Sequence, residues 1–136
     1  MTQCVYLDRV AGYGDPELPA KAAALLEAAG CPVGPGGTAL VKPNLVAPRN
    51  PALSCSHPAV VRAVCLALVE RGARVVVADS PAFGTGRIVA RLAGFEEALA
   101  GLPVTIRSLD RPRRLPLSGG GQAPSSNFSL LTRISR

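Results

Sequence analysis

The chain has 136 residues, 48% hydrophobic and only 4% aromatic, which predicts one domain with a core of valine, leucine and alanine. No apolar run approaches the length of a membrane span, and the first residues lack the pattern of a signal peptide, so we expect a cytoplasmic protein without a membrane anchor. The net charge of +6 would suit nucleic-acid binding, but its distribution argues against that function. Residues 1–106 carry only +1, and residues 107–136 carry +5 without regularly spaced aromatic partners.

The amino-terminal part predicts a strand followed by a helix. Residues 3–7 are rich in β-forming side chains and are interpreted as a first short strand. The helix has two candidate starts: Asp15 can cap it with Pro16 at the first position, or the regular helix begins near Pro19. Leucine and alanine then recur at helical spacing until Gly30, where a left-handed conformation would end the helix.

A strand–helix–strand unit follows. Residues 38–43 are interpreted as a buried strand and residues 46–56 as a long loop. The clearest helix of the chain begins at Pro58, which suits the first helical position and leaves His57 as the cap. The apolar run that follows Arg74 predicts a second buried strand with both faces covered. A βαβ unit of this length predicts parallel strands joined by a right-handed crossover.

The rest of the chain predicts shorter elements. We expect a helix over residues 87–92, a break at a glycine, and one or two helical turns over residues 95–100. Residues 103–107 are interpreted as a further strand, and residues 113–117 as an edge strand. The composition then changes to glycine, serine and arginine, so residues 118–136 are expected to form a disordered tail.

Together these elements predict a three-layer, Rossmann-like α/β sandwich with a mostly parallel sheet of four or five strands. The predicted strand order is 2-1-3-4 or a relative of it, which places the first strand between the two strands of the βαβ unit. The α/β domain is expected to span residues 1–117, with residues 118–136 as its tail.

Polar side chains follow several of these strands, and parallel strands would place them at one edge of the sheet. The expected cluster consists of Lys42 with Asn44, Ser56 with His57, and Asp79 with Ser80. Lys42, together with free N–H groups at the start of the helix at Pro58, would hold a small anion such as a carboxylate or a phosphate. His57 could act as an acid or base, and Asp79 could pair with Lys42 or bind a cation, so these two are the candidate catalytic residues.

Each of these features also has a purely structural interpretation. Gly84 and Gly86 would let a ligand approach the backbone, yet they do not make the full dinucleotide-binding fingerprint. A histidine before a helix proline is more often a cap than a catalyst. Asp79 with Ser80 could simply close a strand in an Asx turn, and Lys42 could merely neutralise Asp79.

The four cysteines are dispersed along the chain and form no Cys-x-x-Cys pair, so no metal site is predicted. Most are expected to be small buried thiols, with Cys4 in the first strand and Cys65 on the apolar face of the long helix. Cys55 lies two residues from His57, and a catalytic Cys–His pair is the alternative, although this spacing in a loop is no signature.

Four sequence blocks carry a resemblance to a known family. They are Leu40–Val46 (LVKPNLV), Ser56–Arg62 (SHPAVVR), Glu70–Ala73 (ERGA) and Val77–Pro81 (VADSP). In this order and spacing they resemble the uncharacterised family called domain of unknown function 362, or DUF362, over residues 4–117. Two departures are visible: Cys55 and Ser56 stand where members tend to have two threonines, and Ala78 replaces a common glycine.

The resemblance implies no defined activity, since the family has none assigned. Some members carry four clustered cysteines for a [4Fe–4S] centre; this chain lacks them, so no cofactor is expected in it. Members are normally longer, so the resemblance implies an amino-terminal fragment, ended by a shifted reading frame or an incomplete gene. Two hypotheses follow. The chain is the anion- or cofactor-binding half of a redox-associated enzyme, inactive alone, or a non-catalytic interaction module that pairs with a missing carboxy-terminal domain or an iron–sulfur partner.

Overall fold

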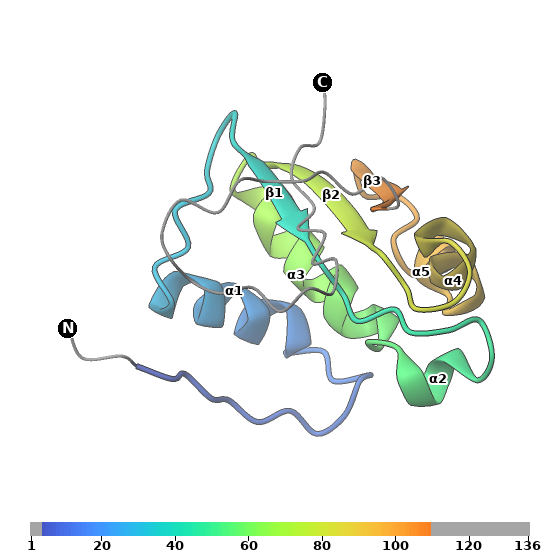
Figure 1. The fold of residues 1–136 in the computed structure, drawn as a ribbon. Helices are drawn as coiled ribbons and strands as arrows, with labels where there is room; N and C mark the ends of the chain where they lie inside the picture. Colours follow the sequence, from blue (N-terminus) through green and yellow to red (C-terminus); the bar gives the residue numbers. More distant parts are fainter. Residues whose placement is uncertain (1–3, 110–136) are drawn as a thin grey trace, which may run out of the picture.

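The computed structural model describes residues 4–109 of the chain, so the predicted edge strand at 113–117 and the tail at 118–136 lie outside the described residues. Helices and strands alternate along most of this part, as Figure 1 shows. The helices are α1 (Leu18–Ala28), α2 (Pro51–Ser54), α3 (Pro58–Glu70), α4 (Gly86–Leu92) and α5 (Phe95–Ala98), and the strands are β1 (Thr38–Val41), β2 (Arg74–Asp79) and β3 (Val104–Ser108).

The three strands form one parallel sheet in the order β1-β2-β3. The predicted α/β class and the parallel βαβ unit are therefore confirmed. The predicted first strand is wrong for the part that the structure describes, because Val5 and Leu7 are 84% and 89% exposed and belong to no strand. Leu40 pairs directly with Val76 in the register of β1 and β2. No place is left between them for another strand, so the predicted order 2-1-3-4 is wrong.

The described helices cover one face of the sheet. Val75 and Val77 of β2 lie in the same core cluster as Val61 of α3 and Val89 of α4, and alternate strand residues share one face. α1 packs against α3, outside the sheet. On the opposite face, Leu40 of β1 is 48% exposed. Residues 4–109 thus form two layers, an open sheet and one layer of helices. The second helical layer of the predicted sandwich is not present among these residues.

α1 begins at Leu18, with Pro19 in its first turn, which supports the second of the two predicted starts. Asp15 does not cap it directly; its carboxylate accepts hydrogen bonds from the N–H groups of Ala11 and Glu17. These two hydrogen bonds lower the pKa of Asp15. The helix ends at Ala28, and Gly30, with a φ of 66°, is the predicted left-handed stop just after it.

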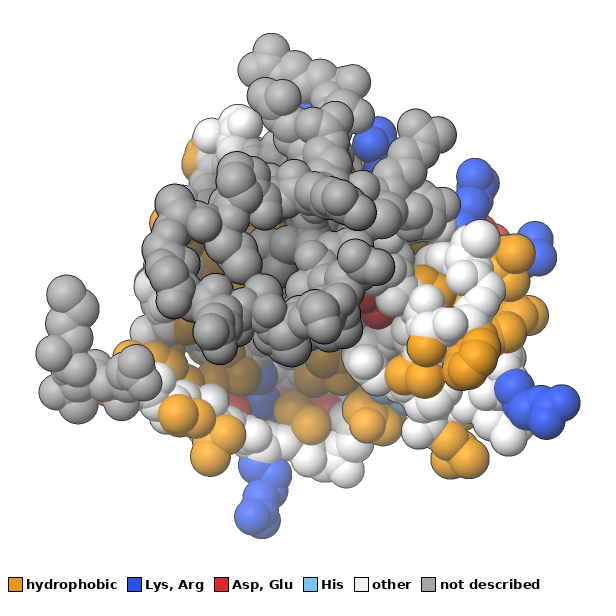
Figure 2. Space-filling view, viewed as in Figure 1, with side chains coloured by type: hydrophobic (Ala, Val, Ile, Leu, Met, Phe, Trp, Pro, Cys, Tyr) orange, Lys and Arg blue, Asp and Glu red, His pale blue; other side chains and the backbone are white. Residues whose placement is uncertain are grey.

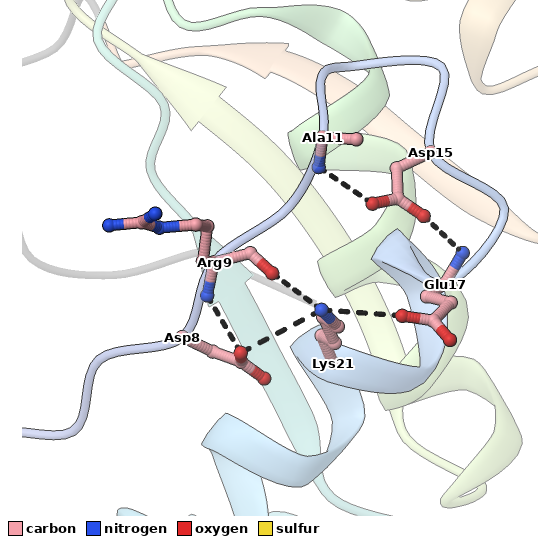
Figure 3. A network of polar contacts seen from close by, with 6 residues as sticks. All are labelled: Asp8, Arg9, Ala11, Asp15, Glu17 and Lys21. Carbon is pink, nitrogen blue, oxygen red and sulfur yellow. Dashed lines mark hydrogen bonds and ion pairs between the residues drawn. The ribbon is translucent and has the colours of Figure 1, made fainter.

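Polar contacts attach the segment before α1 to the helix, as Figure 3 shows. The Lys21 ammonium lies 3.7 Å from Asp8 and 3.3 Å from Glu17, and it also donates to the carbonyl oxygen of Arg9. Partial desolvation lowers the pKa of Lys21, but the hydrogen bond to Glu17 and the neighbouring carboxylates outweigh it and raise the pKa overall. The segment is therefore held by exposed charges rather than by strand pairing.

The loop predicted over residues 46–56 contains a helical turn, α2. Asn50 precedes it in a left-handed conformation with a φ of 50°, and Pro51 occupies the first turn, which suits a proline. For the other helices and the strand at 103–107, the predicted bounds agree with the observed bounds to within one or two residues. No helix between residues 4 and 109 is both long and apolar enough to cross a membrane.

Candidate functional site

Asp79 is the buried charged residue at the carboxyl end of β2, with only 3% of its surface exposed. Its Oδ1 lies 2.6 Å from the Lys42 ammonium and accepts the Ser80 N–H at 2.8 Å, while its Oδ2 accepts the Leu45 N–H at 2.7 Å. Both carboxylate oxygens are therefore engaged by the protein itself. The carboxylate ties the segment after β1 to the end of β2, a connection we call the Asp79 clasp.

Lys42 is the half of the ion pair that meets solvent. Its side chain is 57% exposed, whereas that of Asp79 is 4% exposed. An ammonium group has three donors, and Asp79 is its one ion-pair partner among the described residues. Lys42 and Asp79 thus meet as predicted, and Lys42 retains donors that could reach a ligand.

Asn44 and Ser56 bind each other in a reciprocal pair. The Asn44 N–H donates to the Ser56 hydroxyl oxygen at 2.9 Å, and the Ser56 N–H donates to the Asn44 carbonyl oxygen at 2.9 Å. The Asn44 side-chain amide also donates to the Ser54 carbonyl oxygen at 2.9 Å. These contacts join the segment after β1 to the loop before α3, next to the Asp79 clasp.

His57 is the cap of α3, as predicted. Its extended backbone precedes Pro58, and its Nδ1 accepts the Ala59 N–H at 3.2 Å. The Val60 and Val61 N–H groups donate to the His57 carbonyl oxygen at 3.1 and 3.4 Å. The expectation of free N–H groups at the start of this helix is therefore wrong, because the cap satisfies them. Nδ1 acts as an acceptor here, so the proton of the neutral ring lies on Nε2.

Tyr13 stacks on the His57 ring, with ring centroids 3.7 Å apart and planes 2° from parallel. Sequence reasoning missed this contact, since Tyr13 lies in the loop before α1 and nothing local links the two residues. Within residues 4–109 no hydrogen bond or ion pair joins His57 to Lys42 or Asp79. The His57 cap and the Lys42–Asp79 ion pair are linked through neighbouring backbone segments, but their side chains do not form one site.

Gly86 packs where α4 meets the sheet. A Cβ at Gly86 would lie 2.5 Å from the Asp79 carbonyl oxygen and 3.1 Å from the Ser108 Cα. The close approach expected at this glycine is therefore made by the protein's own strands. Gly84 has a φ of 81°, which favours glycine for the turn before α4. Thr85 caps α4 by accepting the Ile88 N–H.

A small pocket of about 220 Å³ lies where the loop before α3 faces the end of α4. Its lining is Pro51, Ala52, Cys55, Ser56, His57, Pro58, Leu92 and Ala93. The pocket is mainly apolar, and Lys42 and Asp79 are not among its lining residues. It could accept a small apolar group, with Ser56 and His57 at its wall.

The cysteines are less buried than expected. Cys65 is buried, as predicted, and desolvation raises its pKa to about 11. Cys4 is exposed, so its predicted place in a buried strand is wrong, while Cys31 and Cys55 are partly buried. No group of three or more histidine, cysteine, aspartate or glutamate side chains able to hold a metal ion occurs between residues 4 and 109. Residues 4–109 therefore do not provide the four clustered thiolates that a [4Fe–4S] centre needs.

Comparison with known proteins gives a family and one relative. The family described as "Domain of unknown function (DUF362)" matches residues 39–134. The "Thylakoid-associated protein sll1697" of Synechocystis sp. is 37% identical over 140 residues, an alignment that covers 100% of this chain and 41% of the relative. The chain thus spans less than half the length of that relative. No solved structure matches the chain.

Proposed function

The chain belongs to the DUF362 family, and from this premise we propose that it acts as a non-catalytic scaffold and interaction module within a longer protein. One observation carries the proposal: the polar groups at the carboxyl edge of the sheet are engaged with one another. Asp79 uses both carboxylate oxygens on Lys42 and backbone N–H groups, and Asn44 is paired with Ser56. Such a network stabilises the ends of the strands, and most of its polar groups are occupied, although Lys42 keeps donors open to solvent.

The open architecture supports a partner. Three strands with the described helices on one face leave two sheet edges without a further strand from residues 4–109. On the opposite face Val76 and Ala78 of β2 are buried, while β1 is more open. Leu40 is 48% exposed on that face. The matched region is 41% of the relative from Synechocystis, which is therefore more than twice as long, and the name of that relative describes an association with thylakoids rather than a reaction. A longer protein would therefore contain the polypeptide needed to complete the fold.

A ligand screen on the full chain tests the proposal. We expect no change in melting temperature with inorganic phosphate, nucleotides or small carboxylates, together with self-association that grows with protein concentration. A ligand present at about 100 times its dissociation constant would add about 2.7 kcal/mol to the free energy of unfolding, an effect that a thermal shift detects readily. A saturable rise with any of these compounds, absent in Lys42→Met, would contradict the proposal.

A second candidate is the anion- or cofactor-binding half of a redox-associated enzyme. The exposed Lys42 ammonium favours it, because 57% of that side chain is open to solvent and a cation at the carboxyl edge of a parallel sheet suits an anionic ligand. His57 would then be the acid or base, beside the small pocket that Cys55 and Ser56 help to line. Redox chemistry would come from an iron–sulfur partner. The screen with Lys42→Met separates this candidate from the scaffold, since here the ligand-dependent shift must appear and must need Lys42.

A further inference from the structure

A groove runs along the outer side of β3, next to α4 and α5. It consists of two adjoining hollows of about 420 and 300 Å³ that share Arg87 and Glu96. Three consecutive strand residues, Val104, Thr105 and Ile106, line the larger hollow. Successive side chains of a strand point to opposite faces, so a hollow that touches all three must follow the edge of the strand. Figure 2 shows basic and hydrophobic side chains together in the region of α4 and α5, at the right of the view.

The backbone of β3 has donors directed into this groove. β3 is the last strand of the described sheet and pairs only with β2. The Leu109 N–H donates to the Asp79 carbonyl oxygen at 2.9 Å. Because N–H directions alternate along a strand, the Arg107 N–H also points toward β2, whereas the Ile106 and Ser108 N–H groups point to the outer edge. Such an edge is a template for a further strand.

The groove combines an apolar floor with a rim of two arginines, Arg87 and Arg91, and one exposed glutamate, Glu96. Leu99 is 4% exposed at its floor, where Val104 and Ile106 are partly buried. Arg87 and Arg91 are exposed, and neither takes part in an ion pair within residues 4–109. This combination suits an extended segment in which apolar side chains alternate with carboxylates.

We infer that the outer edge of β3 receives an additional strand, contributed by the part of a DUF362 protein that this chain does not match. The added strand places apolar side chains over Leu99 and Ile106 and at least one carboxylate at Arg87 and Arg91. The inference rests on the proposed scaffold function and names where the partner attaches. The chain spans only 41% of the Synechocystis relative, so the remaining polypeptide is long enough to contain such a strand.

The test co-expresses the full 136-residue chain with the unmatched part of the Synechocystis protein as a separate polypeptide. We expect an equimolar complex. In that complex the Ile106 and Ser108 amide hydrogens exchange at least about tenfold more slowly than in the chain alone. The Arg107 amide, already bonded to β2, should keep its exchange rate.

Charge reversal supplies the matched variants. The double variant Arg87→Glu with Arg91→Glu should weaken the complex about tenfold, whereas Arg49→Glu, an exposed arginine far along the chain from the groove, should leave it unchanged. A complex that forms without protection of Ile106 and Ser108 overturns this inference and leaves the scaffold function standing. Failure of the two parts to associate overturns both.

Discussion

Replacement of Gly86 by alanine tests how α4 is seated on the sheet. The new Cβ would lie 2.5 Å from the Asp79 carbonyl oxygen and 3.1 Å from the Ser108 Cα, and ordinary contact begins at 3.4 Å. Both neighbours are backbone atoms of strand ends, so neither can rotate away. The helix must therefore withdraw by about 0.9 Å, which separates Val89 and Ala90, both fully buried, from their core contacts.

Overpacking of this kind costs about 1–3 kcal/mol. The gain in helix propensity from alanine is small, because Gly86 is the first residue of α4. We expect a loss of about 2 kcal/mol in the free energy of unfolding and a fall of about 8 °C in melting temperature. Urea unfolding followed by circular dichroism measures the first quantity, and a thermal scan measures the second.

Gly34→Ala is the matched control. A Cβ at Gly34 has nothing within 4 Å, so this variant should stay within about 0.5 kcal/mol of the natural chain. If Gly86→Ala is as stable as Gly34→Ala, the close packing of α4 against the strand ends is refuted. The role of Gly86 would then have to be sought in ligand approach, as the sequence first suggested.

Three further predictions concern single ionisable groups. In Asp79→Asn an NH2 donor replaces one of the two carboxylate oxygens, each of which accepts a backbone N–H. We therefore expect the free energy of unfolding, measured in urea, to fall by about 2 kcal/mol, and an unchanged midpoint would refute the clasp. Cys65, with a pKa near 11, should stay unmodified by a thiolate-directed reagent at mildly alkaline pH, while exposed Cys4 reacts; equal rates would contradict the burial. The hydrogen bond from Ala11 helps to lower the pKa of Asp15, so its stabilisation is present above the ordinary value of 3.8 and is lost as the pH falls through the lower folded value. The melting temperatures of the natural chain and Asp15→Asn should therefore converge in acid, and a gap that stays constant with pH would oppose this assignment.

Local signals account for the part of the fold that was predicted. Pro58 with His57 before it marks the start of α3, Gly30 marks the end of α1, and the valine run from Arg74 marks β2. Strand order has no such signal, because it depends on which distant runs pair. The run at residues 3–7 has strand propensity, yet β1 pairs directly with β2 and leaves no place between them, and residues 4–7 form no strand.

One contact among the candidate site residues was predicted from the sequence, and the contacts around it were not. The ends of β1 and β2 indicated that Lys42 and Asp79 would meet, and they do. The sequence contains no signal for the Leu45 N–H that occupies the other carboxylate oxygen, or for Tyr13, which stacks on His57 from more than 40 positions away. Contacts of this kind follow from loop geometry, which local patterns do not specify.

Titration of the full chain with inorganic phosphate, followed by amide NMR, tests most directly whether this polar edge is structural. The Asp79 clasp and the capped start of α3 predict that the Lys42, Ser56, His57 and Ser80 amide resonances shift little and do not saturate. Saturable shifts centred on these four amides, abolished in Lys42→Met, would show that the edge binds an anion and would contradict the scaffold.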